Sequence, residues 1–259
     1  EAILEVAQQM DVPVVIHAVT TKGKGYSPAE KNPALFHGVG AFNIKTGEPK
    51  PKSSSPSWTS VFASELVECA KENEDIVAIT AAMSDGTGLN RFADAYPERF
   101  FDVGISEEHA VGMASSLALA GKRPFVAIYS TFMQRAFDQI IVNVALQKAN
   151  VVLCLDRAGL VGDDGPTHHG AFDLSYLRMI PNMRILAPSN DEELRAAVRC
   201  ALELEGPLAI RYPRGAAPQA SAPCEAWEPG KARLVTQGDD GTILAIGKMV
   251  GVAQKVAES

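Results

Sequence analysis

Short apolar segments alternate with helix-like segments between residues 58 and 215, and this alternation restricts the possible folds most strongly. The apolar segments are rich in β-branched residues, which is typical of strands buried on both faces. Such strands separated by helices predict an α/β fold with a doubly wound parallel sheet. We expect strands at 74–80, 100–104, 124–130, 151–156, 183–189 and 207–213, and helices at 59–73, 90–96, 107–120, 134–148, 172–179 and 191–204.

The sequence on either side of this domain predicts further units. Residues 44–57 are rich in Pro, Ser and Lys without apolar periodicity, and residues 216–230 are rich in Pro and Ala, which predicts two linkers. Residues 1–43 and 231–259 are interpreted as fragments of flanking α/β domains, and the chain as a piece of a longer protein. Within these fragments we expect helices at 1–10 and 253–259 and buried strands at 12–19 and 241–247.

Charge and cysteine content argue against several classes of protein. Asp and Glu number 31 against 24 Lys and Arg, without a block of like charge, so we expect neither nucleic acid nor a membrane surface as a partner. The four cysteines form no CxxC pair and no zinc-type spacing, which favours free thiols in a reducing compartment. No apolar run approaches the roughly 20 residues of a membrane span, and we expect no secretory signal. These features favour a cytoplasmic protein.

Three polar segments follow expected strands, and the carboxyl ends of parallel strands share one edge of a sheet, where ligands bind. The first holds Glu107 and Glu108 in the first turn of a helix, with Ser106 as the expected N-cap. The second is 129–139, and the third is the glycine-rich loop 156–170. We expect the three segments to converge in one site.

Each segment also has a simpler explanation. Acidic residues in a first helical turn stabilise the helix dipole by about 0.3–1 kcal/mol without any catalytic role. Tyr129 and Phe132 can be core aromatics. The Asp and His residues of the loop suggest a metal site only weakly, because they lack helical HxxxH spacing. Arg157 and Arg214 suit a phosphate, since guanidinium groups donate forked hydrogen bonds.

Four motifs together resemble one enzyme family. They are ISEEHAV (105–111), YSTFMQRAFDQ (129–139), DRAGLVGDDGPTHHGAFD (156–173) and RYPRG (211–215), preceded by KGKGY (22–26) and Phe36-His37. In this order they resemble the 1-deoxy-D-xylulose-5-phosphate synthases, a family of thiamine-diphosphate-dependent, transketolase-like enzymes. The resemblance covers nearly the whole chain, and the third motif is its most specific part.

The resemblance implies a reaction and a set of partners. Pyruvate is decarboxylated with thiamine diphosphate as cofactor, and the two-carbon unit is transferred to D-glyceraldehyde 3-phosphate. This is the first step of non-mevalonate isoprenoid synthesis, and it also feeds thiamine and pyridoxal synthesis. A homodimer and bound Mg²⁺ are implied as well, in the cytoplasm or, in a plant, the plastid stroma.

The resemblance also implies roles for single residues. Glu107 is the catalytic acid at the aminopyrimidine ring of the cofactor, and Phe132 stacks on that ring. The remaining roles are cofactor contacts for Ile105, Tyr26 and Lys22, catalysis for His37 and His168, and substrate binding for Tyr129, Arg157, Asp164, His168 and Arg214, with both arginines on the acceptor phosphate.

Two departures from the family pattern are visible. Glu108 stands where the family usually has Gln, which places a second carboxylate beside Glu107. The Gly-Asp-Gly…Asn segment that holds Mg²⁺ and the diphosphate is absent, so no metal ligand is assigned and the ligands are expected outside this chain. Two alternatives stay open: a transketolase or a 2-oxoacid dehydrogenase beta-type subunit, and a non-catalytic fragment.

Overall fold

The computed structural model describes residues 2–50, 55–220, 224, 227–228 and 230–259. The chain divides into two compact units, Glu1–Ser53 and Ser54–Ser259. Parts of the two expected linkers, namely 51–54 and the positions 221–223, 225–226 and 229, lie outside the described residues. None of the described helices is both long and apolar enough to cross a membrane.

The larger unit is built on a six-stranded sheet with the order β2-β1-β3-β4-β6-β5. Every neighbouring pair of strands is parallel, which confirms the predicted doubly wound α/β fold. All residues of β1 and β4 are buried, as the apolar runs predicted. The strands are β1 (Ile76–Thr80), β2 (Phe100–Asp102), β3 (Arg123–Tyr129), β4 (Val152–Asp156), β5 (Arg184–Leu186) and β6 (Leu208–Arg211).

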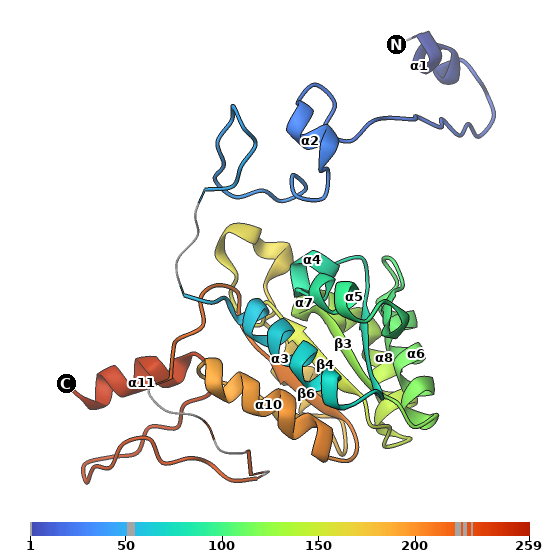
Figure 1. The fold of residues 1–259 in the computed structure, drawn as a ribbon. Helices are drawn as coiled ribbons and strands as arrows, with labels where there is room; N and C mark the ends of the chain where they lie inside the picture. Colours follow the sequence, from blue (N-terminus) through green and yellow to red (C-terminus); the bar gives the residue numbers. More distant parts are fainter. Residues whose placement is uncertain (1, 51–54, 221–223, 225–226, 229) are drawn as a thin grey trace. The chain divides into compact units, whose positions relative to one another are not determined.

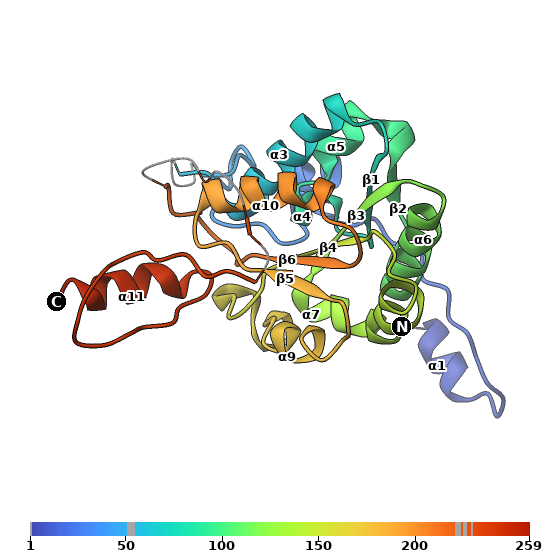
Figure 2. The ribbon, with the colours of Figure 1, turned by 90° about the horizontal axis from the view of Figure 1, so that it is seen from below.

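Helices cover both faces of this sheet (Figures 1 and 2). One face carries α3 (Trp58–Glu72), α5 (Asn90–Ala95) and α10 (Asp191–Glu203). The other carries α6 (Glu107–Leu119), the π-helix η3 (Ile140–Ala145) and α9 (Asp173–Leu177). The remaining helical segments of this unit are α4 (Ser84–Thr87), η1 (Pro97–Arg99), α7 (Ser130–Met133), η2 (Gln134–Ala136), α8 (Phe137–Gln139), η4 (Gly162–Asp164), η5 (Pro166–His168) and α11 (Met249–Ala257).

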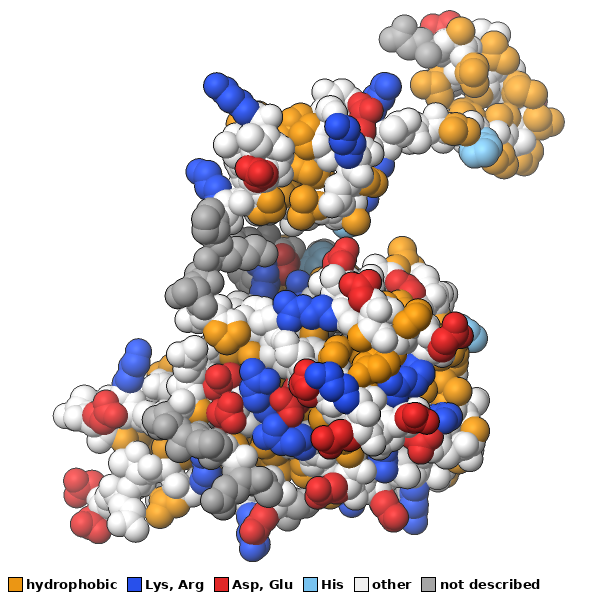
Figure 3. Space-filling view, viewed as in Figure 1, with side chains coloured by type: hydrophobic (Ala, Val, Ile, Leu, Met, Phe, Trp, Pro, Cys, Tyr) orange, Lys and Arg blue, Asp and Glu red, His pale blue; other side chains and the backbone are white. Residues whose placement is uncertain are grey.

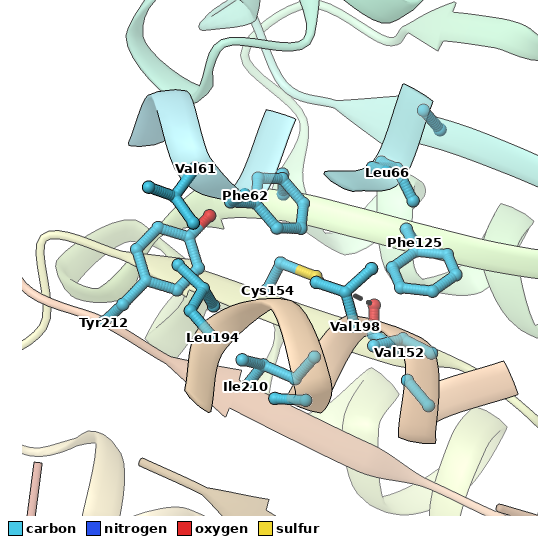
Figure 4. Close-up of a cluster of buried hydrophobic side chains, with 14 of the residues drawn as sticks. Val61, Phe62, Leu66, Phe125, Val152, Cys154, Leu194, Val198, Ile210 and Tyr212 are labelled. Atoms are coloured by element: carbon cyan, nitrogen blue, oxygen red, sulfur yellow. Dashed lines mark hydrogen bonds between the residues drawn. The ribbon is translucent and has the colours of Figure 1, made fainter. Parts of the chain in front are cut away.

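The core between the sheet and its α3–α10 layer is a continuous apolar cluster (Figure 4). Phe62 of α3 stacks on Tyr212 with ring centroids 5.4 Å apart. Leu194 and Val198 of α10 complete the layer above Cys154 of β4. Burial of each such side chain contributes roughly 1.5–3 kcal/mol, so this packing holds the strands in place beneath the site.

One expected helix start was wrong. The helix expected from residue 134 begins at Ser130, directly after β3, and passes through 3-10 geometry into η3. The hydroxyl of Ser115 donates to the Asn143 carbonyl at 2.5 Å, which satisfies a carbonyl of the π-helical turn. Helix α10 begins at Asp191, as expected, and its N-cap is Asn190, whose side chain accepts a hydrogen bond from the Glu193 amide at 2.9 Å.

Two expected strands are not strands. Residues 12–19 and 241–247 have no ladder partner among the described residues, and most of them are exposed, as Val15 at 94% and Leu244 at 90% illustrate. An apolar run forms a strand only when a neighbouring strand accepts its backbone hydrogen bonds. Both segments are apolar, but apolar composition does not specify a neighbouring strand.

The smaller unit contains α1 (Ala2–Gln8) and α2 (Ser27–Lys31). Its centre is a cluster of three aromatic rings, in which Phe36 contacts Tyr26 at 5.5 Å and Phe42 at 5.2 Å. Residues 41–50 fold back on themselves, since the Lys50 amide donates to the Ala41 carbonyl at 2.9 Å. The first part of the expected 44–57 linker therefore belongs to this unit.

Candidate active site

Two of the three predicted polar segments follow β3 and β4, which lie side by side, whereas the segment with Glu107 follows β2, which β1 separates from β3. Tyr129, the last residue of β3, is in register with Asp156, the last residue of β4. The loop that follows β1 reaches the same place, because the Gly86 carbonyl accepts a hydrogen bond from Arg157 at 2.6 Å. Loops that follow three adjacent strands therefore meet at the carboxyl edge of the sheet.

Glu107 and Glu108 lie in different environments at the start of α6. Glu107 is only 2% exposed, whereas Glu108 is exposed. Among the described residues, the one polar partner of Glu107 is Arg135, whose Nη1 lies 3.4 Å from Oε2. Ser106 is the N-cap, as expected, but its side chain makes no capping bond. Burial thus distinguishes two carboxylates that are equivalent by their position in the first turn of the helix.

Two aromatic rings and a histidine gather beside the end of β3. Phe132 and Tyr129 stack with centroids 5.8 Å apart and ring planes 15° apart. His168 meets Phe132 edge-on at 5.4 Å. All three side chains are only partly buried, and Phe132 also packs against the apolar core on its side of the sheet. Part of the surface of the two aromatic rings therefore stays accessible beside the end of β3.

Arg157 is held in place on several sides. Its guanidinium lies 3.9 Å from the centroid of the Tyr129 ring and 3.1 Å from Asp156 Oδ1. Its backbone has φ +59°, a left-handed conformation that is costly for a non-glycine residue. The surrounding contacts offset that cost, so the position of the guanidinium is strongly determined.

The two arginines predicted for a phosphate share one carboxylate. Asp164 Oδ2 lies 3.8 Å from Arg157 Nε, and its Oδ1 lies 3.3 Å from Arg214 Nη1. Arg214 also donates to the Val161 carbonyl at 3.2 Å. The fold therefore brings two guanidinium groups, distant in sequence, to within reach of a single anionic group.

The predicted residues of the smaller unit also approach one another. Lys22 Nζ lies 2.8 Å from His37 Nδ1. The Tyr26 hydroxyl donates to the Ile44 carbonyl at 2.8 Å. In the larger unit, Ile105 is 76% exposed and precedes Glu107 by two residues. The proposed roles of these four residues rest on the family resemblance.

Sequence reasoning missed several residues that shape this site. Gly86 lies so close to Tyr129 that a Cβ at position 86 would be 2.8 Å from Tyr129 Cζ. Ser130, Asp173 and Arg211 form a buried hydrogen-bonded group below the loop. Ser130, Asp173 and Arg211 lie inside the quoted motifs, but each resembles an ordinary surface residue in a one-dimensional reading. Their position within the motifs was the one feature of the sequence that could have indicated a role for them.

The pKa of Asp156 is raised because its carboxyl group is buried. The carboxyl group is fully buried, which raises its pKa from 3.8 to about 6 despite Arg157 and a 2.7 Å hydrogen bond from Thr59. Between about pH 4 and 6 the folded protein holds a proton that the unfolded chain has released. The stability contribution of the protonated form is therefore present below pH 4 and lost as pH rises through 6.

We expect Asp156→Asn to remove this pH dependence. A shift of about two pKa units corresponds to roughly 3 kcal/mol, so the free energy of unfolding should fall by this order between pH 4 and 7 in the unsubstituted protein. The slope should be much smaller in the variant, because the amide does not titrate. Urea denaturation at several pH values measures both slopes. An unchanged slope in Asp156→Asn would show that other groups cause it.

The comparisons with known proteins show the family to which the larger unit belongs. A family model described as transketolase, pyrimidine binding domain, matches residues 54–219. The chain belongs to this family of thiamine-enzyme domains.

Its curated relatives are named 1-deoxy-D-xylulose-5-phosphate synthase, which confirms the resemblance. The protein from Carboxydothermus hydrogenoformans is 55% identical over 247 residues, which cover 95% of this chain and 40% of the relative. The protein from Heliobacterium modesticaldum is 52% identical over 248 residues, which cover 95% of this chain and 38% of the relative. The chain thus spans about two fifths of the length of the curated relatives it matches.

Solved structures show the same fold. A structure described as "Split gene transketolase, inactive beta4 tetramer" is 35% identical, with a TM-score of 0.70 over 79% of this chain and 67% of that one. Transketolase from Campylobacter jejuni has a TM-score of 0.56 at 23% identity, over 63% of this chain and 26% of that one, and shows the fold alone.

The residues present fit the pyrimidine end of thiamine diphosphate. A buried carboxylate usually accepts several hydrogen bonds, yet among the described residues Glu107 has only the 3.4 Å contact with Arg135. A ring nitrogen is a suitable further partner for such a group. Phe132, partly buried and nearly parallel to Tyr129, offers the flat apolar surface that an aromatic heterocycle needs.

Proposed function

We propose that this chain supplies the pyrimidine-binding part of a 1-deoxy-D-xylulose-5-phosphate synthase. The reaction decarboxylates pyruvate and joins the two-carbon unit to D-glyceraldehyde 3-phosphate. The observation that carries the proposal is the placement of Glu107, a buried carboxylate at the start of α6. Its one described polar partner is Arg135, which lies in the helical segment that follows β3 and carries Phe132. Relatives at 52–55% identity with this name support the synthase over a transketolase or a 2-oxoacid dehydrogenase subunit.

Thiamine diphosphate, when bound, supplies a carbon nucleophile and an electron sink. In this proposal Glu107 holds a proton at the pyrimidine N1′. Phe132 contacts the face of the same ring. Lys22, Tyr26 and Ile105 bind other parts of the cofactor, in keeping with the family resemblance.

The remaining residues act on the substrates. His168 and His37 move protons at the oxygens of donor and acceptor, because an imidazole ring can both donate and accept a proton. Arg157 and Arg214 bind the acceptor phosphate, which orients the aldehyde at the other end of the molecule. Tyr129 and Asp164 line the same pocket, since both contact Arg157.

A homodimer, Mg²⁺ held by residues outside this chain and a cytoplasmic location, or the plastid stroma in a plant, complete the proposal. The decisive assay uses a full-length protein that contains this sequence. Product should form from pyruvate and glyceraldehyde 3-phosphate only when thiamine diphosphate and Mg²⁺ are both added. Turnover of a ketose phosphate donor in place of pyruvate would contradict the synthase assignment and favour a transketolase.

Arg214→Ala should raise KM for glyceraldehyde 3-phosphate by about 10- to 100-fold, because a hydrogen bond to a charged group contributes about 1.5–3 kcal/mol. KM for pyruvate should change little. Steady-state kinetics with each substrate varied in turn measure both constants. Arg178→Ala is the matched control, since Arg178 is an exposed arginine at the end of α9. An effect confined to pyruvate would contradict the phosphate role of Arg214.

A further inference from the structure

The loop that carries Asp164 and His168 is closed at a narrow neck. The Gly159 amide donates to the Gly170 carbonyl, and the Gly170 amide donates to the Gly159 carbonyl, both at 2.9 Å. These two bonds join the ends of the loop like the neck of an Ω-loop. The position of this neck therefore helps to determine where the side chains of Asp164 and His168 lie.

The neck rests directly on Ser130. A Cβ at Gly170 would lie 2.5 Å from Ser130 Cβ and 2.7 Å from the Arg157 carbonyl oxygen, closer than such atoms approach in proteins. Only glycine therefore allows this contact. Ser130 is 2% exposed and follows Tyr129, the last residue of β3. The position of the neck thus depends on how Ser130 is held.

Asp173 holds Ser130 and a strand end at the same time. Its Oδ2 accepts the Ser130 hydroxyl at 3.0 Å and the Arg211 Nε–H at 2.9 Å. Its Oδ1 accepts the Leu174 amide at 2.7 Å. Asp173 is 2% exposed, and the Arg211 side chain is 15% exposed. One buried carboxylate therefore ties together the starts of α7 and α9 and the end of β6.

We propose that Asp173 is a positioning residue, which with Ser130 and Arg211 anchors the neck of the substrate loop. The inference rests on the proposed function and extends it to residues that touch neither substrate nor cofactor in that proposal. A second contact supports it, because Thr131 donates to the Thr167 carbonyl at 3.0 Å, next to His168. Helix α7, which carries Phe132, thus holds the loop at two points.

Asp173→Asn tests this role with little change in shape. An amide has one acceptor oxygen, so it cannot accept from Ser130 and Arg211 on one side and from Leu174 on the other. The neck should loosen and the loop should shift relative to Phe132. We expect KM for glyceraldehyde 3-phosphate to rise at least about tenfold while KM for pyruvate stays near its normal value, since small misplacements of binding groups cost large factors.

Hydrogen exchange provides a readout that does not depend on activity. In the full-length protein, peptides spanning 158–170 should exchange faster in Asp173→Asn than in the unsubstituted protein. Ser130→Ala, which removes one bond and no charge, should give the same pattern to a smaller degree. It keeps the test informative if Asp173→Asn folds poorly.

Glu65→Gln is the matched control. Glu65 is also a buried carboxylate paired with arginines, accepting from Arg195 at 3.1 Å and Arg199 at 2.6 Å. These contacts belong to the α3–α10 layer, where acidic and basic side chains interleave at the surface (Figure 3). Glu65→Gln should lower stability without changing exchange in 158–170 or KM for the acceptor.

The outcomes separate the two proposals. If Asp173→Asn behaves like Glu65→Gln in both KM and exchange, the anchoring role is wrong even though the enzyme is active. If the unsubstituted protein makes no product from pyruvate and glyceraldehyde 3-phosphate, the proposed function is wrong. Exchange in 158–170 then still decides whether Asp173 anchors the loop.

Discussion

Glu107→Gln in a full-length protein is expected to lower turnover at least about 100-fold, with saturating thiamine diphosphate and both substrates present. Glutamine keeps the shape of the side chain but has no proton to share with the pyrimidine N1′. The fold should be retained, because the only described polar partner of Glu107 is Arg135, which is 55% exposed and can be solvated by water. Initial rates and a thermal melt measure the two effects separately.

Glu108→Gln is the matched control for this prediction. The same change is made at the next residue, where the side chain is exposed and the family usually has Gln. We expect activity close to that of the unsubstituted protein. Loss of activity in Glu108→Gln together with near-normal turnover in Glu107→Gln would reverse the assignment of the two carboxylates.

The sequence predicted the sheet well for a physical reason. A strand such as β4 is buried on both faces, and burial requires an unbroken apolar run that is visible in one dimension. The same criterion failed at 12–19 and 241–247, because a strand also needs a partner and composition does not specify one. The start of α10 at Asp191 was predicted correctly, and Asn190 caps it.

The site was only partly predictable from sequence. Glu107 and Glu108 are equivalent by spacing, and only the rotation of α6 against the sheet buries one and exposes the other. The hydrogen-bonded group of Ser130, Asp173 and Arg211 could not be predicted for a related reason. Its members lie after β3, after β4 and at the end of β6, so their contact depends on strand register, which a linear sequence does not state.

Arg157→Met should destabilise the larger unit more strongly at pH 8 than at pH 5. Arg157 lowers the pKa of the buried Asp156, whose carboxyl lies 3.1 Å away. Without the guanidinium, that pKa rises further above 6, and ionisation of the carboxyl at high pH becomes more costly. Removing one partner of a buried ion pair typically costs about 3–5 kcal/mol, and we expect a loss of this order at pH 8.

At pH 5 the carboxyl group of Asp156 is largely protonated in the folded protein, so the same substitution should cost much less. What remains there is the loss of the contact with the Tyr129 ring and of the bond to the Gly86 carbonyl. Urea denaturation at pH 5 and 8 measures the difference. Arg214→Ala is the control, because Arg214 pairs with the partly exposed Asp164 and should show no comparable pH dependence. Equal destabilisation by Arg157→Met at both pH values would mean that Asp156 does not titrate near pH 6.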